Sequence, residues 1–148
     1  MGEPITKEHL MRYKGWRLRV KIDEDRIKEA ESAAEFPSMR ESDGSQHQPG
    51  SRGGMPGAER LVDLKAELMP NIEENKRKMR RIEQAINSLS NPLEQSVLVA
   101  RYLSGETCEQ NRWAVVAKMI YGNDDEKDIK NATRLHGSAL LSIAKEEF

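Results

Sequence analysis

The stretch that decides the fold is residues 58–89, AERLVDLKAELMPNIEENKRKMRRIEQAINSL. Side chains of one face recur every three or four positions, which is the spacing of an α-helix. That face comprises Leu61, Leu64, Leu68, Ile72, Asn75, Met79, Ile82, Ile86 and Leu89. The spacing changes around Leu68, and Pro70 lies at that point, so we expect a kink or a break there.

Residues 6–36 carry a matching pattern that predicts a first helix. Thr6 is suited to cap it and Pro37 to end it. Its coiled-coil-like seam, which Asp23 interrupts, comprises Tyr13, Trp16, Val20, Ile27, Ala30 and Ala34. Between the two helices, residues 37–57 are rich in Gly, Ser and Pro, which predicts a flexible linker. Residues 1–90 are therefore expected to form an antiparallel helical hairpin, with a homodimer through the same seams as the alternative.

Shorter helices with clear start and stop signals are expected from residue 91 onward. The segment SNPLEQSVLVARYLSG, residues 90–105, predicts a compact helix over Leu93–Leu103. Thr107 and Gln110 form a capping-box pattern that should open the next helix, whose apolar stripe contains Trp113, Val116, Ala117 and Ile120. Gly122 is expected to end that helix.

The final helix has two distinct faces, and Asp124 or Asp125 is expected to cap it. One face reads as the core stripe and contains Ile129, Ala132, His136, Ala139, Leu140 and Ile143. Lys127, Lys130, Asn131, Arg134, Ser138 and Lys145 lie opposite. His136 is expected to be a packed core residue, and Gly137 to permit close approach of another helix.

Residues 91–122, NPLEQSVLVARYLSGETCEQNRWAVVAKMIYG, followed by RLHGSALLSI at 134–143, resemble the region-4-like domain of sigma factors. The chain is similar to small phage-encoded transcriptional regulators of the RinA and ArpU kind, which join an N-terminal helical segment to such a domain. The matching parts are ARYLSG, VVAKMIYG and RLHGSAL. The resemblance implies an all-α protein in which residues 91–148 form a helix-turn-helix DNA-binding domain.

The same resemblance implies that the last helix enters the major groove of DNA. Its reading face would comprise Lys130, Asn131, Arg134 and Ser138, and Lys127 and Lys145 complete the set of residues expected to bind DNA. The chemistry agrees, because Arg pairs with guanine edges, Asn with adenine and Lys with phosphate. The chain departs from the family pattern in the extra residues NDDEKDIKNAT, 123–133, whose carboxylates repel DNA while suiting a helix N-terminus.

Two basic stretches in the hairpin offer a second DNA-contacting surface. They are RYKGWRLRVK, residues 12–21, and KRKMRR, residues 76–81. In an antiparallel hairpin with position 36 near 58, position 17 lies near 77, so the two stretches meet. Their cations can track a phosphate backbone or remain solvated helix faces. They are Arg12, Lys14, Arg17, Arg19, Lys21, Lys76, Arg77, Lys78, Arg80 and Arg81.

Composition restricts the other classes of function. The formal net charge is −1, so only local clusters of charge can attract nucleic acid. The one cysteine, Cys108, excludes an internal disulfide, and the histidines are too far apart in sequence to suggest a metal site. We expect no cofactor, no metal and no membrane span, and a location in the cytoplasm of a bacterial host. With no catalytic constellation in sight, we expect the chain not to be an enzyme.

The sequence therefore favours a phage or prophage transcription regulator that binds promoter DNA and contacts host RNA polymerase, as the sigma resemblance implies. Two alternatives stay open. One is a small terminase-like DNA-packaging protein, which also joins a helix-turn-helix to oligomerising helices. The other is a protein-binding inhibitor module without DNA affinity, which the acidic residues near the last helix favour.

Overall fold

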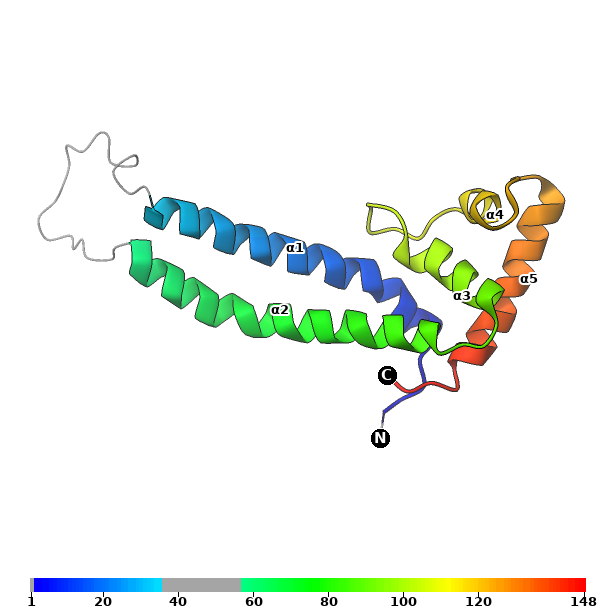
Figure 1. Cartoon of the computed structure of the whole chain (residues 1–148), viewed down its shortest axis with the longest axis horizontal. Coiled ribbons are helices and arrows are strands. Elements are labelled where there is room, and N and C mark those ends of the chain that lie inside the picture. Colours follow the sequence, from blue (N-terminus) through cyan, green and yellow to red (C-terminus); the bar gives the residue numbers. More distant parts are fainter. Residues whose placement is uncertain (1, 36–56) are drawn as a thin grey trace, which may run out of the picture. The chain divides into compact units, whose positions relative to one another are not determined.

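A computed structural model describes residues 2–35 and 57–148, and within them the protein is all-α (Figure 1). The elements are α1 (Lys7–Glu35), α2 (Gly57–Asn87), α3 (Pro92–Leu98), the π-helical turn η3 (Val99–Leu103), α4 (Trp113–Tyr121) and α5 (Glu126–Ile143). The expected all-α class is confirmed. The expected linker lies outside the described residues, except for Gly57, which begins α2.

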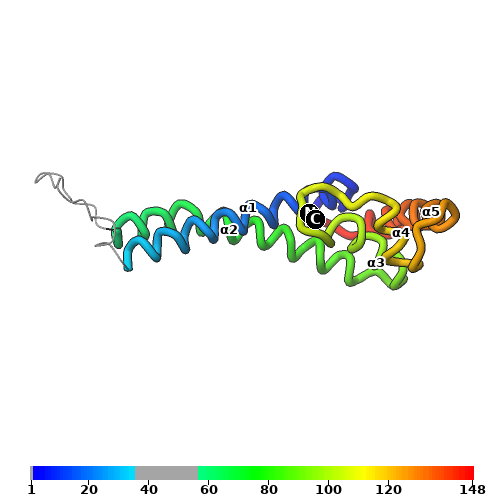
Figure 2. Tube along the Cα trace, turned by 90° about the horizontal axis from the view of Figure 1, so that it is seen from above, coloured from blue at the N-terminus to red at the C-terminus, as the bar shows by residue number. Residues whose placement is uncertain are grey.

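The chain divides into two compact units, Met1–Leu18 with Lys76–Phe148, and Arg19–Asn75. Both units contain parts of α1 and α2, which run side by side in opposite directions in Figures 1 and 2. The register agrees with the expected hairpin, because the Lys78 amine lies 5.7 Å from the centre of the Trp16 ring and Lys65 pairs with Glu31 at 3.4 Å. The boundary at residue 90 between two domains stays a prediction.

In the unit Arg19–Asn75, apolar side chains from α1 and α2 form the seam. Val20, Ile27, Leu68 and Ile72 are buried there. The helix α2 continues through Pro70, so the expected break is wrong. Pro70 is exposed, and the loss of its N–H removes only one hydrogen bond on the solvent side while the buried residues on either side hold the helix.

Asp23 is the one carboxylate in this seam, and its side chain is fully buried. Its Oδ2 accepts a hydrogen bond from Arg19 Nε at 3.1 Å, and Arg26 lies 3.9 Å from Oδ1. Both arginines come from α1 itself, at positions i−4 and i+3. Arg19 and Arg26 thus balance the charge from within the helix, while Oδ1 accepts no hydrogen bond, and the seam continues past the interruption that the sequence showed.

The other unit has a single hydrophobic core to which every helix of the described residues contributes. Its largest fully buried side chains include Ile5, Leu10, Ile82, Ile86, Leu98, Tyr102 and Ile143. The termini pair beside this core, where Ile5 N–H donates to Glu146 O at 3.0 Å and Phe148 N–H donates to Glu3 O at 2.8 Å. The Phe148 ring then stacks on His9, with the ring centres 4.4 Å apart.

The expected compact helix over Leu93–Leu103 is present, but it changes type half-way. Asn91 caps α3 by accepting the Leu93 N–H at 2.9 Å. From Val99 to Leu103 the turn widens, and Ser104 N–H donates to Val99 O at 2.9 Å, five residues back. The wider turn leaves carbonyl groups open, and the Asn111 side-chain amide donates to two of them, Ala100 O at 2.7 Å and Ser104 O at 3.0 Å.

The capping box expected at Thr107 and Gln110 is wrong. Residues 104–112 form an irregular loop, and α4 begins only at Trp113 with no side-chain cap. The contacts of Asn111 explain why α4 begins at Trp113 and not at Thr107. Its side chain holds η3, and its backbone N–H donates to Arg101 O at 3.1 Å, so the chain at this point is tied to the preceding helix. A helix starting at Thr107 would break these bonds.

His136 is a core residue, as expected from its place on the apolar stripe of α5. It is 8% exposed, its Nε2 lies 2.6 Å from the Tyr102 hydroxyl, and the Trp113 ring packs edge-on against it at 4.9 Å between centres. Burial, with the nearby charges of Arg101 and Lys7 adding to it, lowers the pKa of His136 to about 4. The folded protein therefore holds a neutral imidazole at neutral pH.

This burial predicts a pH-dependent stability. The unfolded chain takes up a proton on His136 below about pH 6.5, whereas the folded chain does so only near pH 4. The stability that neutral His136 contributes is present above pH 6.5 and is lost as the pH falls toward 4, by about 3 kcal/mol in total. Urea unfolding of the wild-type chain and of His136→Gln at several pH values checks this, since Gln does not titrate.

We expect the difference in unfolding free energy between these two proteins to shrink or reverse in that pH range. Tyr102→Phe is the matched control, because it removes the hydrogen-bond partner but keeps the titrating ring, and so it should retain the pH dependence. A constant difference between wild type and His136→Gln from pH 7 to pH 4 would contradict the assignment.

Candidate nucleic-acid interface

The helices α4 and α5 are joined by a short turn with sharp limits on both sides. Gly122 ends α4 in the left-handed conformation at φ 82°, and its N–H donates to Lys118 O at 2.9 Å. Asp125 caps α5 through its Oδ1, which accepts the Asp128 N–H at 2.9 Å. Both sequence-based expectations are confirmed. They arise from local chemistry, since glycine adopts positive φ without strain and aspartate satisfies free N–H groups at a helix start.

The helix α5 packs against α3 and α4 with the face that the sequence indicated. Ala132, His136, Ala139 and Ile143 are buried, and Ile129 and Leu140 are partly buried. The six residues expected to contact DNA lie outside this stripe. Lys127, Lys130, Arg134, Ser138 and Lys145 are exposed and Asn131 is half-buried.

Ser138 is engaged within the protein. Its hydroxyl donates to Glu94 Oε2 at 2.5 Å, and the Ser142 hydroxyl donates to Glu94 Oε1 at 2.7 Å. These two hydrogen bonds, that from Ser138 first, lower the pKa of Glu94, which is 8% exposed. The carboxylate thus fastens α3 to α5. Ser138 is therefore better placed to fix the position of α5 than to contact a base.

The remaining polar residues of the face are arranged along α5 as follows. Lys130 lies 3.7 Å from Glu126, one turn earlier, and both side chains are largely exposed. Such a surface pair is weak, so the lysine is available to a stronger anion. Arg134 is exposed in the middle of the helix, and Lys145 lies just beyond the last helical residue, Ile143.

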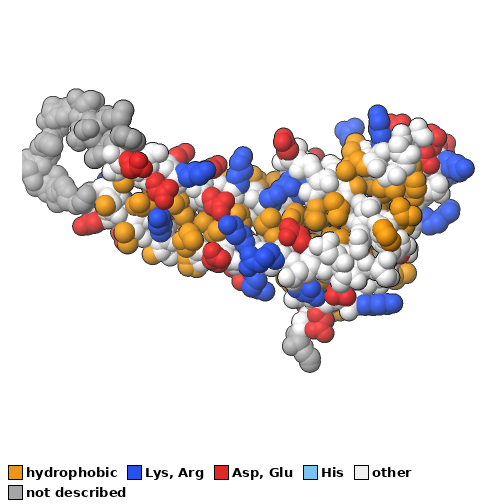
Figure 3. All heavy atoms as spheres, in the orientation of Figure 1, with side chains coloured by type: hydrophobic (Ala, Val, Ile, Leu, Met, Phe, Trp, Pro, Cys, Tyr) orange, Lys and Arg blue, Asp and Glu red, His pale blue; other side chains and the backbone are white. Residues whose placement is uncertain are grey.

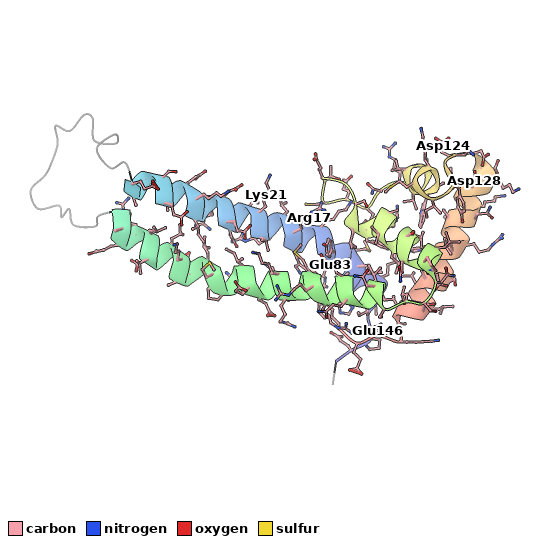
Figure 4. All side chains as sticks on the ribbon, viewed as in Figure 1. Arg17, Lys21, Glu83, Asp124, Asp128 and Glu146 are labelled. Atoms are coloured by element: carbon pink, nitrogen blue, oxygen red, sulfur yellow. The ribbon has the colours of Figure 1, made fainter. Side chains whose placement is uncertain are left out.

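Carboxylates surround the start of α5. Figure 4 shows Asp124 and Asp128 beside the turn that joins α4 to α5, and Asp125 and Glu126 lie between them in sequence. In the space-filling view, acidic and basic side chains are neighbours at this end of the domain (Figure 3). The cations of α5 therefore lie along the helix, and its N-terminus carries negative charge that would oppose a phosphate there.

The basic stretch of α1 is used largely inside the protein. Lys14 is 2% exposed, and its amine donates to Glu109 O at 2.9 Å. Arg17, labelled in Figure 4, donates to Leu103 O at 2.9 Å and to Gly105 O at 2.5 Å. Burial, and then the charge of Arg17, lowers the pKa of Lys14. The sequence left two alternatives for these cations, contact with a phosphate backbone or a solvated helix face. The structure shows a third role, because both bind carbonyl groups at the end of η3 and in the loop that follows it.

The basic stretch of α2 is also partly engaged. Arg81 donates from Nε to Glu147 O at 2.5 Å and lies 3.5 Å from Glu146 Oε1. Lys78 lies over the Trp16 ring, which confirms that the two basic stretches meet near this point. Arg12, Arg19, Lys21, Arg77 and Arg80 are exposed, and Lys76 is half-buried. Arg19 pairs with Asp23. Fewer cations of the two basic stretches are therefore available to an external anion than the sequence alone suggested.

The described residues contain neither a candidate metal site nor a candidate membrane-spanning helix. No group of three His, Cys, Asp or Glu side chains in residues 2–35 and 57–148 is placed to hold a metal ion. Over the same residues, no helix is long and apolar enough to cross a membrane. Cys108 is an exposed free thiol.

Comparison with known proteins finds no family model, no curated protein and no solved structure that matches this chain. The resemblance to sigma-like regulators thus stays a prediction from the sequence.

The internal role of Arg17 predicts a stability effect that its neighbour Arg12 does not share. Arg17→Gln removes two charged hydrogen bonds to backbone carbonyls, so the unfolding free energy should fall by about 1–3 kcal/mol. Arg12→Gln, on the same helix at an exposed position, should change it by less than about 0.5 kcal/mol. Chemical denaturation of both variants checks this, and equal stabilities would show that the loop contacts contribute nothing.

Proposed function

We propose that this chain is a phage or prophage transcription regulator that binds duplex DNA through α4, the turn at Gly122 and α5. The single observation that carries the proposal is the division of α5, which buries one face against α3 and α4 and leaves a face with lysine and arginine exposed. A helix of 9 residues, a glycine-bearing turn and a second helix of 18 residues follow one another here, and two helices joined by such a turn are the arrangement of helix-turn-helix proteins. Contact with host RNA polymerase rests on the sigma resemblance alone.

The chemistry of the exposed face supports DNA as the ligand. Arg134 is exposed at mid-helix, where a guanidinium can donate two hydrogen bonds to guanine O6 and N7. Lys127 and Lys130 are exposed on the preceding turns and suit phosphate groups. Buried contacts of Ala132, His136 and Ala139 keep the helix from rotating, so the same face stays outward.

The carboxylates at the start of α5 restrict how DNA can approach. An end-on approach would bring a phosphate toward Asp125 and Asp128, where like charges repel. An approach with the helix lying along the groove keeps the phosphates near Lys127 and Lys130 instead. We therefore infer that the middle of α5, around Arg134, contacts the bases.

One experiment tests the function directly. The intact chain is used to enrich duplexes from a random-sequence library, and binding to an enriched duplex and to a scrambled one is measured by fluorescence anisotropy at several salt concentrations. Preferential binding supports the proposal. No binding to any duplex at low salt would favour the second candidate, a protein-binding module, for which the acidic turn is the specific argument.

Arg134→Ala separates base reading from general attraction. It should weaken binding to the enriched duplex by about 1–3 kcal/mol and leave binding to the scrambled duplex nearly unchanged, because a base-edge contact depends on sequence. Lys145→Ala is the control, since a lysine beyond the helix end reaches only the backbone and should weaken both complexes alike. Unchanged affinity of Arg134→Ala for the enriched duplex would remove α5 as the reading helix.

A further inference from the structure

Gly137 occupies a position that the fold itself does not explain. It lies inside α5, it is exposed, and a Cβ atom built on it meets nothing within 4 Å. The expectation that it permits close packing of another helix of this chain is therefore wrong. A glycine inside a helix is less favourable than alanine. Gly137 therefore lowers the stability of α5, and no contact within the chain requires it.

The residues around Gly137 on the outward face of α5 indicate why a glycine is present there. At about 100° per residue, Arg134 and Leu141 are about 20° apart around α5, and Gly137 is within about 60° of both. Leu141 is 75% exposed, more than any other large apolar side chain in the described residues. The outward face thus presents a cation, a gap without a side chain, and an apolar group on consecutive turns.

We propose that Gly137 and Leu141 belong to the DNA-reading surface, an inference that rests on the proposed function of α5. The gap at Gly137 lets the duplex come against the helix backbone. Leu141 contacts the C5-methyl group of a thymine in the major groove, the apolar feature by which a protein distinguishes that base. Duplex DNA is the occupant because Lys127, Lys130 and Arg134 share this face, and their charge complements phosphate and guanine edges.

The first test compares two glycines that are equivalent within the fold. Gly15 is also exposed inside a helix, α1, and its added Cβ likewise meets nothing within 4 Å. Gly137→Ala and Gly15→Ala should each raise the melting temperature by about 2–4 °C, because alanine favours the helix. Only Gly137→Ala should weaken binding to the enriched duplex, by about fivefold or more, since one extra methyl group disturbs a close-packed contact.

The outcome is decided by the contrast between the two variants. A stabilised Gly137→Ala protein with clearly weaker DNA binding than Gly15→Ala supports the gap. Equal affinities for the two variants overturn it. In a Gly137→Ala protein whose melting temperature is raised as expected, a loss of binding cannot be assigned to unfolding.

The second test removes the apolar group from each side of the proposed contact, the C5-methyl group of thymine on one side and the isopropyl group of Leu141 on the other. Each thymine of the enriched duplex is replaced in turn by uracil, which lacks only the C5-methyl group, and binding is measured for the wild-type chain and for Leu141→Ala. At one position the replacement should weaken wild-type binding by about fourfold, the equivalent of one buried methyl group. The same replacement should not affect Leu141→Ala.

The failures are distinguishable from one another. If the wild-type chain enriches no duplex, or Arg134→Ala binds the enriched duplex normally, the proposed function fails and this inference fails with it. If Arg134→Ala loses selective binding but no thymine couples to Leu141, only the thymine contact is overturned. A change of oligomeric state in Leu141→Ala, without coupling to any thymine, would overturn it in favour of a second copy of the chain on this face.

Discussion

At the centre of the apolar stripe of α5 lies one buried polar contact, the 2.6 Å hydrogen bond between the Tyr102 hydroxyl and His136 Nε2, with Ala132, Ala139 and Ile143 buried around it. Tyr102 belongs to the π-helical turn and His136 to the centre of the apolar stripe, so the bond fixes α5 in both rotation and depth. An unpaired polar group at this depth would be costly, which disfavours any other rotation of the helix. The direction of the outward face, and with it the proposed function, follows from this buried pair.

The cations of the hairpin show how a charge pattern in the sequence can have two physical meanings. Lys14 and Arg17 donate to the backbone carbonyls of Leu103, at the end of η3, and of Gly105 and Glu109 in the irregular loop after it. A positive side chain satisfies such carbonyls as well as it satisfies a phosphate. Their role inside the protein leaves the exposed face of α5 as the surface with the strongest argument for the proposed DNA contact.

Much of the fold follows from sequence periodicity, because burial of one helix face is a local property of the chain. The stripe of α5, the stop at Gly122 and the cap at Asp125 were all predictable in this way. The loop at residues 104–112 was not, since Asn111 bonds to carbonyl groups that only the π-helical turn exposes. Ser138 was assigned to DNA for a similar reason, because its partner, Glu94, lies 44 residues away in sequence.

The two faces of α5 differ in how well their residues suit the folded chain alone. This difference is the strongest argument that the outer face contacts a ligand. On the inner face the buried imidazole of His136 is paired with the Tyr102 hydroxyl, and Ala132, Ala139 and Ile143 pack around it. On the outer face the chain retains a glycine that weakens the helix and a leucine that is 75% exposed. A helix shaped only by folding would place alanine and a polar residue at these positions. Because both departures lie beside Arg134, a single contact with an external partner accounts for them together.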